Sequence, residues 1–301
     1  MRLGVDGCEE ALELRRASDG RDDEIESHGR TLTLVPLVSV LLAVHNDKRF
    51  LAEAVASVLA QTLRDLELIV VDDASDEPVE GFDDPRVTVL HNDTQAGLAA
   101  SLNRALDRAS GKYVARLDAD DVALPERLAL QVERLRGRTA VVGTAVVDVD
   151  EAGGKGRTHV MPTGATALRW HALFSSPFFH PTVLVDRGVL DAHGLRYDPA
   201  FEESEDYDLW TRLFEHADGD NLREALVLKR VHAGQASQRR GDVQKSFQRR
   251  VALREVSHYG VDAEAVWRGS RTELGRLLRA FERRHGVDWS VRKAAVRRFF
   301  A

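Results

Sequence analysis

The sequence predicts an α/β protein with a Rossmann-like, mostly parallel sheet flanked by helices and followed by a C-terminal helical appendage. Short apolar runs such as Val38–Val44 alternate with segments such as Phe50–Gln61, whose apolar residues recur at helical spacing. Because such β-α-β alternation makes consecutive strands run the same way, the sheet should be largely parallel. Beyond about Gln235 the pattern becomes wholly helical and basic, which indicates the appendage.

Length and composition narrow the class of protein. The 301 residues suffice for one large domain with an appendage or for two domains. The single Cys8 excludes a disulfide framework and a cysteine-based zinc cluster. No run approaches the about 18 to 20 apolar residues of a membrane span, and no signal-peptide core is present, so we expect a cytoplasmic protein. The net charge of -7 argues against a nucleic-acid partner.

We expect three parts along the chain. Residues 1–34 are polar and charge-mixed and should form a mobile tail. Residues 35–237 carry the strand and helix alternation and should form the main domain. Residues 238–301 should form the basic helical region.

Polar residues follow each of the first predicted strands. His45-Asn46-Asp47 comes after the first strand, Asp72-Asp73-Ala74-Ser75 after Leu66–Val71, and His91-Asn92-Asp93 after Val87–Leu90. In open α/β sheets, ligands bind at the carboxyl ends of the strands. The sequence therefore predicts a ligand site at this edge. An Asx-turn is the structural alternative for Asp72 and Asp73.

The stretch from Gly111 to Glu126 is the strongest single signal. The apolar segment Tyr113–Leu117 is followed by three carboxylates in four positions, Asp118, Asp120 and Asp121. Crowded carboxylates raise one another's pKa unless a cation lies between them. Hard oxygen ligands favour Mg²⁺ or Mn²⁺. The alternative is a solvated acidic loop that caps the following helix.

The second half continues the alternation with less regular spacing. We expect a helix from Pro125 to about Arg136, a strand at Ala140–Val147, a Gly-rich turn at Asp148–Arg157, a helix at Ala165–Phe174, a strand at Thr182–Val185, a loop at Gly194–Glu203, an amphipathic helix opened by Glu205-Asp206, and a strand at Ala225–Val231 that ends in His232.

The segment from Gln244 to Ala301 holds fourteen Lys or Arg against six Asp or Glu, with aromatic and aliphatic residues interleaved. A helical cap that packs on the main domain explains this pattern. The alternative is a basic amphipathic surface for an anionic membrane or an acidic partner.

Five segments, in this order, carry a resemblance to a known family. They are Pro36-Leu-Val-Ser-Val-Leu-Leu-Ala-Val-His-Asn46, Leu66-Glu-Leu-Ile-Val-Val-Asp-Asp-Ala-Ser75, Leu117-Asp-Ala-Asp-Asp121, Glu205-Asp-Tyr-Asp-Leu-Trp210 and Arg230-Val-His232. Over about Pro36 to Ser237 the chain resembles an inverting family-2 glycosyltransferase of the GT-A fold. Such a protein moves one sugar from a nucleoside diphosphate sugar to an acceptor hydroxyl.

The resemblance implies roles at matching positions. Asp206 would be the general base, with Glu205 beside it in the motif. Arg116, Asn103 and Arg104 would lie near the donor, with pairing to Asp118 as the structural alternative for Arg116 and a solvated helix face for the other two. The remaining nucleotide-sugar-binding residues would be Ala43, His45, Asn46, Asp72, Asp73, Asp118 and Asp120, and the metal ligands would be Asp120, Asp121 and His232.

The resemblance also implies Mn²⁺ or Mg²⁺ as cofactor and a UDP, GDP or dTDP sugar as donor. The acceptor would be a saccharide, a lipid-linked saccharide or another hydroxyl compound, as in cell-envelope polysaccharide biosynthesis. Residues 244–301 could then hold the protein at the inner face of a membrane. A non-catalytic nucleotide-sugar or carbohydrate binding module with the same fold is the alternative from another class.

Two rival enzymes fit less well. Asp118-Ala-Asp120 superficially resembles the nucleophile motif of haloacid-dehalogenase-type phosphatases, but Asp121-Val122 follows where that family usually has a hydroxyl or Gly. A Rossmann dehydrogenase needs a Gly-x-Gly-x-x-Gly turn after its first strand, and His45-Asn46-Asp47 offers none.

Overall fold

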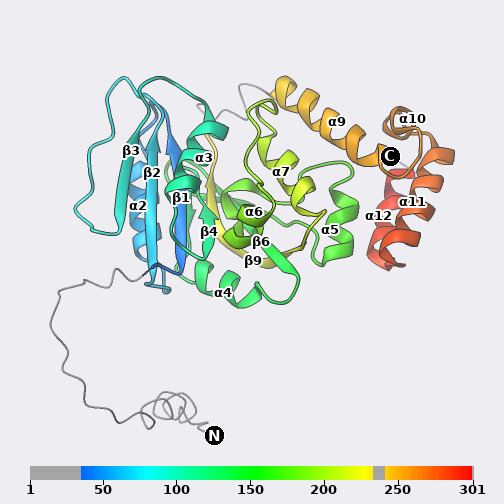
Figure 1. Cartoon of the computed structure of the whole chain (residues 1–301), viewed down its shortest axis with the longest axis horizontal. Helices are drawn as coiled ribbons and strands as arrows, with labels where there is room; N and C mark the ends of the chain where they lie inside the picture. Colours follow the sequence, from blue (N-terminus) through cyan, green and yellow to red (C-terminus); the bar gives the residue numbers. More distant parts are fainter. Residues whose placement is uncertain (1–34, 233–240, 300–301) are drawn as a thin grey trace, which may run out of the picture. The chain divides into compact units, whose positions relative to one another are not determined.

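The structure is a computed structural model that describes residues 35–232 and 241–299 (Figure 1). The predicted tail at 1–34 lies outside the described residues. In chain order the elements are β1 (Val38–Val44), α2 (Leu51–Leu59), β2 (Leu66–Asp72), β3 (Val87–His91), α3 (Leu98–Arg108), β4 (Tyr113–Arg116), β5 (Val122–Ala123), α4 (Arg127–Arg134), β6 (Thr139–Val149), β7 (Lys155–His159), α5 (Ala165–His171), the 3-10 turn η1 (His180–Thr182), β8 (Leu184–Asp186), α6 (Arg187–Ala192), α7 (Glu205–Leu213), β9 (Asp218–Arg230), α9 (Gly241–Ser257), α10 (Ala263–Trp267), α11 (Arg271–His285) and α12 (Trp289–Phe299).

One mixed sheet connects the strands in the order β3-β2-β1-β4-β8-β6-β9-β5, with β7 paired to β6. The pairs β1–β2, β2–β3, β1–β4 and β6–β9 are parallel. The pairs β4–β8, β6–β8, β6–β7 and β5–β9 are antiparallel. The predicted α/β architecture is confirmed, whereas the expected parallel direction holds throughout only for β3-β2-β1-β4.

The continuous apolar run of β1 reflects burial on both of its faces. Leu41 packs in a cluster with Leu102 and Leu106 of α3, while Val40 and Leu42 pack in a second cluster with α2. Alternate side chains of a strand point to opposite faces, so a strand covered on both sides must be apolar at every position. The helices α3 and α2 therefore cover opposite faces of the parallel half.

The structure departs from the sequence expectations at β5, at η1, where Thr182 was expected to begin a strand, and at three further elements. β7 forms where we expected only a Gly-rich turn, because Lys155–His159 pairs through its backbone while its side chains stay largely exposed. β9 begins at Asp218 rather than near Ala225, since the polar Asp218–Leu222 segment pairs in parallel with β6. α6 continues directly from β8, with the Asp186 side chain capping its first turn.

The C-terminal helices pack as a cap, the first of the two alternatives for this region. Trp170 and Leu173 share a buried cluster with Leu277 and Phe281 of α11. Arg254 of α9 forms an ion pair with the buried Asp208 of α7. Within the described ranges, no helix has both the length and the apolar character needed to cross a membrane.

Candidate functional site

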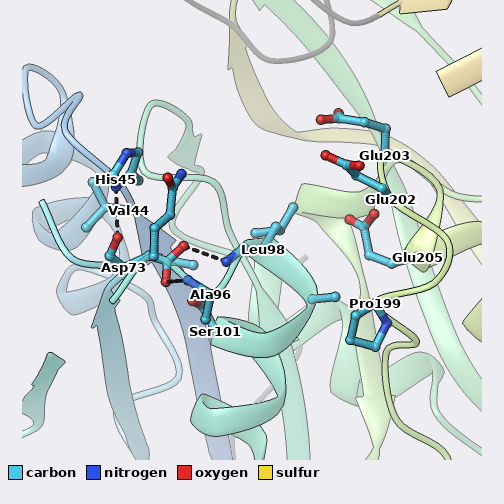
Figure 2. Close-up of a pocket in the computed structure, with 14 residues that line it drawn as sticks. Val44, His45, Asp73, Ala96, Leu98, Ser101, Pro199, Glu202, Glu203 and Glu205 are labelled. Carbon is cyan, nitrogen blue, oxygen red and sulfur yellow. Dashed lines mark hydrogen bonds between the residues drawn. The ribbon is translucent and has the colours of Figure 1, made fainter. Parts of the chain in front are cut away.

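A cavity of ≈ 480 Å³ lies at the carboxyl ends of β1 and β2 (Figure 2). Ala43, His45 and Asp73 line one side of it, together with the loop and first turn of α3. The opposite side is lined by the segment that leads into α7. Its lining residues are Ala43, Val44, His45, Asp73, Gln95, Ala96, Gly97, Leu98, Ala99, Ser101, Pro199, Glu202, Glu203 and Glu205.

Asp73 joins the end of β2 to the start of α3. Its carboxylate accepts hydrogen bonds from the backbone N–H groups of Ala96 and Gly97, both at 2.8 Å, and from Asn92 Nδ2 at 2.6 Å. Burial alone would raise the pKa of Asp73, but these hydrogen bonds outweigh it and lower the pKa. Gly97, at φ 87°, supplies the left-handed backbone that this turn requires. The wall of the cavity is therefore fixed by an ionised carboxylate.

The neighbouring Asp72 faces away from this cavity. Its oxygens accept from the backbone N–H groups of Ser75 at 3.0 Å and Val79 at 2.8 Å, and His91 lies 3.3 Å away. These contacts overcome the effect of burial and lower the pKa of Asp72. Asp72 thus has a structural role in the turn after β2, although its bonds reach three and seven residues along the chain and not the two residues of an Asx-turn.

His45 and Asn46 have different surroundings. His45 lines the cavity, and its Nδ1 lies 2.8 Å from the carbonyl oxygen of Asp73. Asn46 adopts φ 62°, and its Oδ1 accepts from the backbone N–H of Asp76 at 2.8 Å. Asn46 thus ties two loops together and does not line the cavity.

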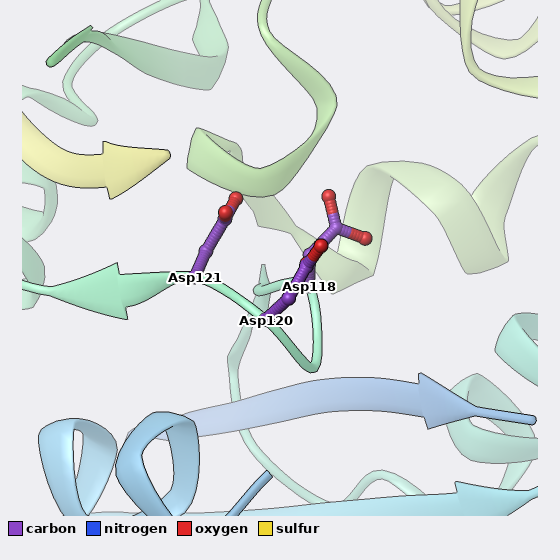
Figure 3. Close-up of side chains that lie close together, drawn as sticks. All are labelled: Asp118, Asp120 and Asp121. Atoms are coloured by element: carbon purple, nitrogen blue, oxygen red, sulfur yellow. The ribbon is translucent and has the colours of Figure 1, made fainter. Parts of the chain in front are cut away.

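Asp118, Asp120 and Asp121 project to the same side of the turn between β4 and β5 (Figure 3). One ligand atom from each lies within 4.8 Å of the others. Asp121 is 1% exposed, and its Oδ1 accepts from the Arg230 backbone N–H at 2.9 Å. Its Oδ2 is buried and has no hydrogen-bond partner. Burial, followed by the charges of Asp118 and Asp120, raises the pKa of Asp121 well above its ordinary value.

This donor set fits a divalent cation. Three clustered carboxylates supply hard oxygen ligands, and the buried, unpartnered oxygen of Asp121 is a group that a cation would satisfy. His232 Nε2 lies 2.9 Å from Asp120 Oδ2, so the structure brings His232 to the same cluster. Asp118 forms an ion pair with Arg116, which is the structural alternative considered for that arginine.

Arg230, in the last of the five motif segments, holds the acidic turn in place. Its Nε donates to the Asp120 carbonyl oxygen at 3.0 Å, and its Nη2 donates to Glu53 Oε2 at 2.6 Å. The guanidinium also lies 4.1 Å from the centre of the Phe50 ring. Together with its N–H on Asp121, these contacts hold the acidic turn against β9 and α2.

Glu205 and Asp206 begin α7, which is anchored by the fully buried Tyr207 and Trp210. Glu205 is 5% exposed and lines the cavity, whereas Asp206 does not line it and accepts from Ser176 Oγ at 3.1 Å. Burial and the neighbouring Asp206 raise the pKa of Glu205 to about 8, and burial raises the pKa of Asp206. Both acids therefore hold a proton more readily than solvated carboxylates do.

The two residues predicted near the donor on α3 hold loops instead of lining the cavity. Asn103 Nδ2 donates to the Tyr197 carbonyl oxygen at 2.8 Å, and its Oδ1 accepts from the Tyr197 N–H at 2.9 Å. Arg104 donates to the His91 carbonyl oxygen and to Asn92 Oδ1, both at 2.5 Å. Asn103 thereby fixes the segment that carries Pro199 and Glu202 to the cavity.

Sequence reasoning missed the lining residues of that segment and of the α3 entry loop. Gly97 before an amphipathic helix was a usable signal for the entry loop. For Pro199, Glu202 and Glu203 the sequence holds only an irregular loop, so their approach to Asp73 depends on tertiary folding. Glu203 adopts φ 62°, an uncommon conformation for a residue other than glycine.

The mixed sheet with its helices has the GT-A type fold, which the matching solved structures share. Residues 39–191 match the family described as glycosyl transferase family 2, and the chain belongs to that family. It is therefore a protein of the glycosyltransferase class.

Known proteins agree with this assignment. The putative glycosyltransferase EpsE of Bacillus subtilis (strain 168) is 36% identical over 206 residues, which is 64% of this chain and 72% of that protein. S. aureus TarS 1-349 in complex with UDP-GlcNAc matches with a TM-score of 0.57 at 18% identity, over 73% of this chain and 66% of that chain. Mannosyltransferase PcManGT from Pyrobaculum calidifontis, in complex with GDP-Man and Mn²⁺, matches with a TM-score of 0.50 at 17% identity, over 88% and 85% of the two chains.

Proposed function

We propose that this protein transfers a single sugar from a nucleoside diphosphate sugar to an acceptor hydroxyl, with inversion and with the help of Mn²⁺ or Mg²⁺. The observation that carries the proposal is the buried Asp121 oxygen without a partner, within a cluster of three carboxylates. A buried acceptor left unsatisfied is costly, and a cation that also binds a diphosphate would satisfy it.

The donor's nucleoside end fits the cavity beside Asp73 and the first turn of α3. Backbone and polar groups of Ala43, His45 and Ser101 face this space and suit a base and a ribose. The related folds TarS and PcManGT carry UDP-GlcNAc and GDP-Man, which supports a nucleotide sugar as the ligand class. We therefore expect a UDP, GDP or dTDP sugar as the donor.

Asp120 and Asp121 would hold the cation, with His232 next to Asp120 and Asp118 on the ribose side. Such a cation supplies Lewis-acid stabilisation of the charge that develops on the departing diphosphate. Arg230 keeps the turn in place through the Asp120 carbonyl and the Asp121 carboxylate. The protein thus contributes a preorganised set of oxygens.

Asp206 would take the proton from the attacking acceptor hydroxyl. A buried carboxylate with a raised pKa is a stronger base than a solvated one, and its fixed place at the start of α7 limits its motion. Glu205, which faces the cavity, would contact the sugar or the acceptor at the side opposite Asp73. Attack from that side would displace the diphosphate in one inverting step.

A donor screen tests the function directly. Purified protein is incubated with UDP, GDP and dTDP sugars, Mn²⁺ and simple saccharide acceptors, and released nucleoside diphosphate is measured. We expect release with one nucleotide class, dependent on acceptor and abolished by chelation with EDTA. Metal-dependent donor binding without release under any acceptor would support the non-catalytic binding module instead. The absence of both binding and release would contradict the proposal.

A further inference from the structure

The outer face of α12 is formed by Trp289, Lys293, Val296 and Arg297. Lys293, Val296 and Arg297 follow Trp289 by four, seven and eight residues, so all four side chains lie on one side of the helix. Trp289 is 71% exposed and Val296 is 50% exposed. A large aromatic side chain so fully exposed to water is unusual, and here it belongs to a continuous face.

The opposite side of α12 is already used for packing. Val291 and Ala295 are buried in the cluster that contains Trp170 and Phe281. The guanidinium of Arg298 lies 3.9 Å from the centre of the Phe174 ring. Because the inner side fixes α12 on the cap, the outer face is exposed without any change in the fold.

All charged residues of α12 are basic. The helix contains Arg292, Lys293, Arg297 and Arg298 and no acidic residue. Arg292 pairs with Glu282, but in the part of the chain that the structure describes Lys293 and Arg297 form no ion pair. Residues 241–299 hold fourteen Lys or Arg against seven Asp or Glu, although the whole chain has a net charge of -7.

Several other cations of the cap have acidic partners. Arg249 pairs with Glu264, Arg254 with Asp208 and Arg276 with Glu273. Lys293 and Arg297 are exposed cations on the same helix face as Trp289 and Val296. Their field attracts an anionic partner.

We propose that the outer face of α12 binds the surface of a membrane that contains anionic lipids. Trp favours the interface between lipid headgroups and acyl chains, where its ring is apolar and its N–H stays hydrated. Lys and Arg beside it reach lipid phosphates while their aliphatic stems cover apolar surface. A flat membrane accommodates a protruding Trp and Val flanked by two cations. This inference does not depend on the proposed transfer reaction.

Vesicle co-sedimentation tests the inference with the full chain. Vesicles of phosphatidylcholine alone are compared with vesicles that contain phosphatidylglycerol, at low and at high NaCl. The test variants are the double variant Lys293→Glu with Arg297→Glu, and Trp289→Ser. The matched control is Arg108→Glu with Lys112→Glu. Both residues are exposed and lie at the other end of β4 from the acidic turn, and the two substitutions change the net charge as much as those in α12 do.

We expect wild type to bind the anionic vesicles, to bind them more weakly but still measurably at high NaCl, and to ignore pure phosphatidylcholine. Each basic residue near an anionic surface strengthens binding about fivefold, so the double variant should bind at least about 25-fold more weakly, while the control stays near wild type. Trp289→Ser should weaken binding at both salt concentrations. Circular dichroism and donor binding should be unchanged in every variant.

Three results would overturn the inference. Wild type could remain in the supernatant with anionic vesicles at low salt. The control could lose binding as strongly as the α12 variant, which would show a net-charge effect without a defined surface. Sedimentation velocity could reveal a dimer that Trp289→Ser dissociates, in which case a second copy of the chain covers this face.

Discussion

Two sets of acids near the carboxyl edge of the sheet have opposite electrostatic surroundings. Asp72 and Asp73 are almost fully enclosed, yet backbone N–H groups supply their hydrogen bonds and lower their pKa. Asp121 and Glu205 are equally buried, but they lack enough donors and their pKa is raised. Burial is therefore not what separates them. The difference lies in whether the protein itself satisfies the carboxylate.

Asp72 and Asp73 therefore have a structural role, whereas Asp121 and Glu205 belong to the proposed binding site. The first pair is committed to holding β2, the 75–79 turn and the α3 entry loop. The second set retains unsatisfied capacity that a cation, a sugar hydroxyl or a proton can meet. Removing a charge from Asp72 or Asp73 should consequently change stability, whereas removing one from the second set should change metal-dependent binding or the pH dependence of stability.

The largest expected effect is on turnover in Asp206→Asn. Because the amide cannot accept the acceptor's proton, turnover should fall by about 10² to 10⁴-fold, while donor affinity stays near wild type. Steady-state kinetics with the donor found in the screen measure turnover, and calorimetry measures donor affinity.

Asp208→Asn is the control on the same helix, since Asp208 pairs with Arg212 and Arg254. It should lower stability and leave turnover of the folded protein intact. Unchanged turnover in Asp206→Asn would remove this residue as the base.

The next effect concerns the pH dependence of stability. The pKa of Glu205 rises from 4.5 to about 8 on folding, so the folded state binds more protons between these values. Stability should therefore fall by up to about 1.4 kcal/mol per pH unit over this window, and Glu205→Gln should remove that slope. Urea unfolding of both proteins at pH 5 and pH 8 measures it. A relative gain for Glu205→Gln at pH 5 instead of pH 8 would contradict the burial argument.

A smaller effect is expected on stability in Asp73→Asn. The variant loses the charge that accepts from Ala96, Gly97 and Asn92, which should cost about 1 to 3 kcal/mol at pH 7. The pKa of Asp73 is lowered on folding, so its contribution is present above pH 3.8 and is lost as the pH falls through the folded value. The difference between wild type and variant should accordingly shrink in acid. A stability difference that does not depend on pH would point to packing alone.

The sequence was sufficient for features that follow from local patterns. Apolar runs such as Val38–Val44 located the strands, and the polar residues after them lie at the edge of the sheet where the structure has its cavity. Trp170 and Trp210, which lie in predicted helices, are buried in the core.

The remaining features depend on contacts between distant segments. No local pattern distinguishes Asp73, whose partners are 23 and 24 residues away, from Asp121, whose oxygen stays unpartnered. Asn103 bonds to Tyr197, 94 residues further along the chain, and no local pattern predicts this contact. The antiparallel direction of β8 likewise follows from how the chain returns through η1 and not from its composition.

The most direct test of this account is calorimetric titration of the preferred nucleotide sugar with and without Mn²⁺, in wild type, Asp121→Asn and Asp72→Asn. The account predicts that Mn²⁺ strengthens binding to wild type and to Asp72→Asn, and that this enhancement is absent in Asp121→Asn although the protein remains folded. An enhancement that persists in Asp121→Asn, or one that is lost equally in both variants, would contradict the distinction between satisfied and unsatisfied carboxylates.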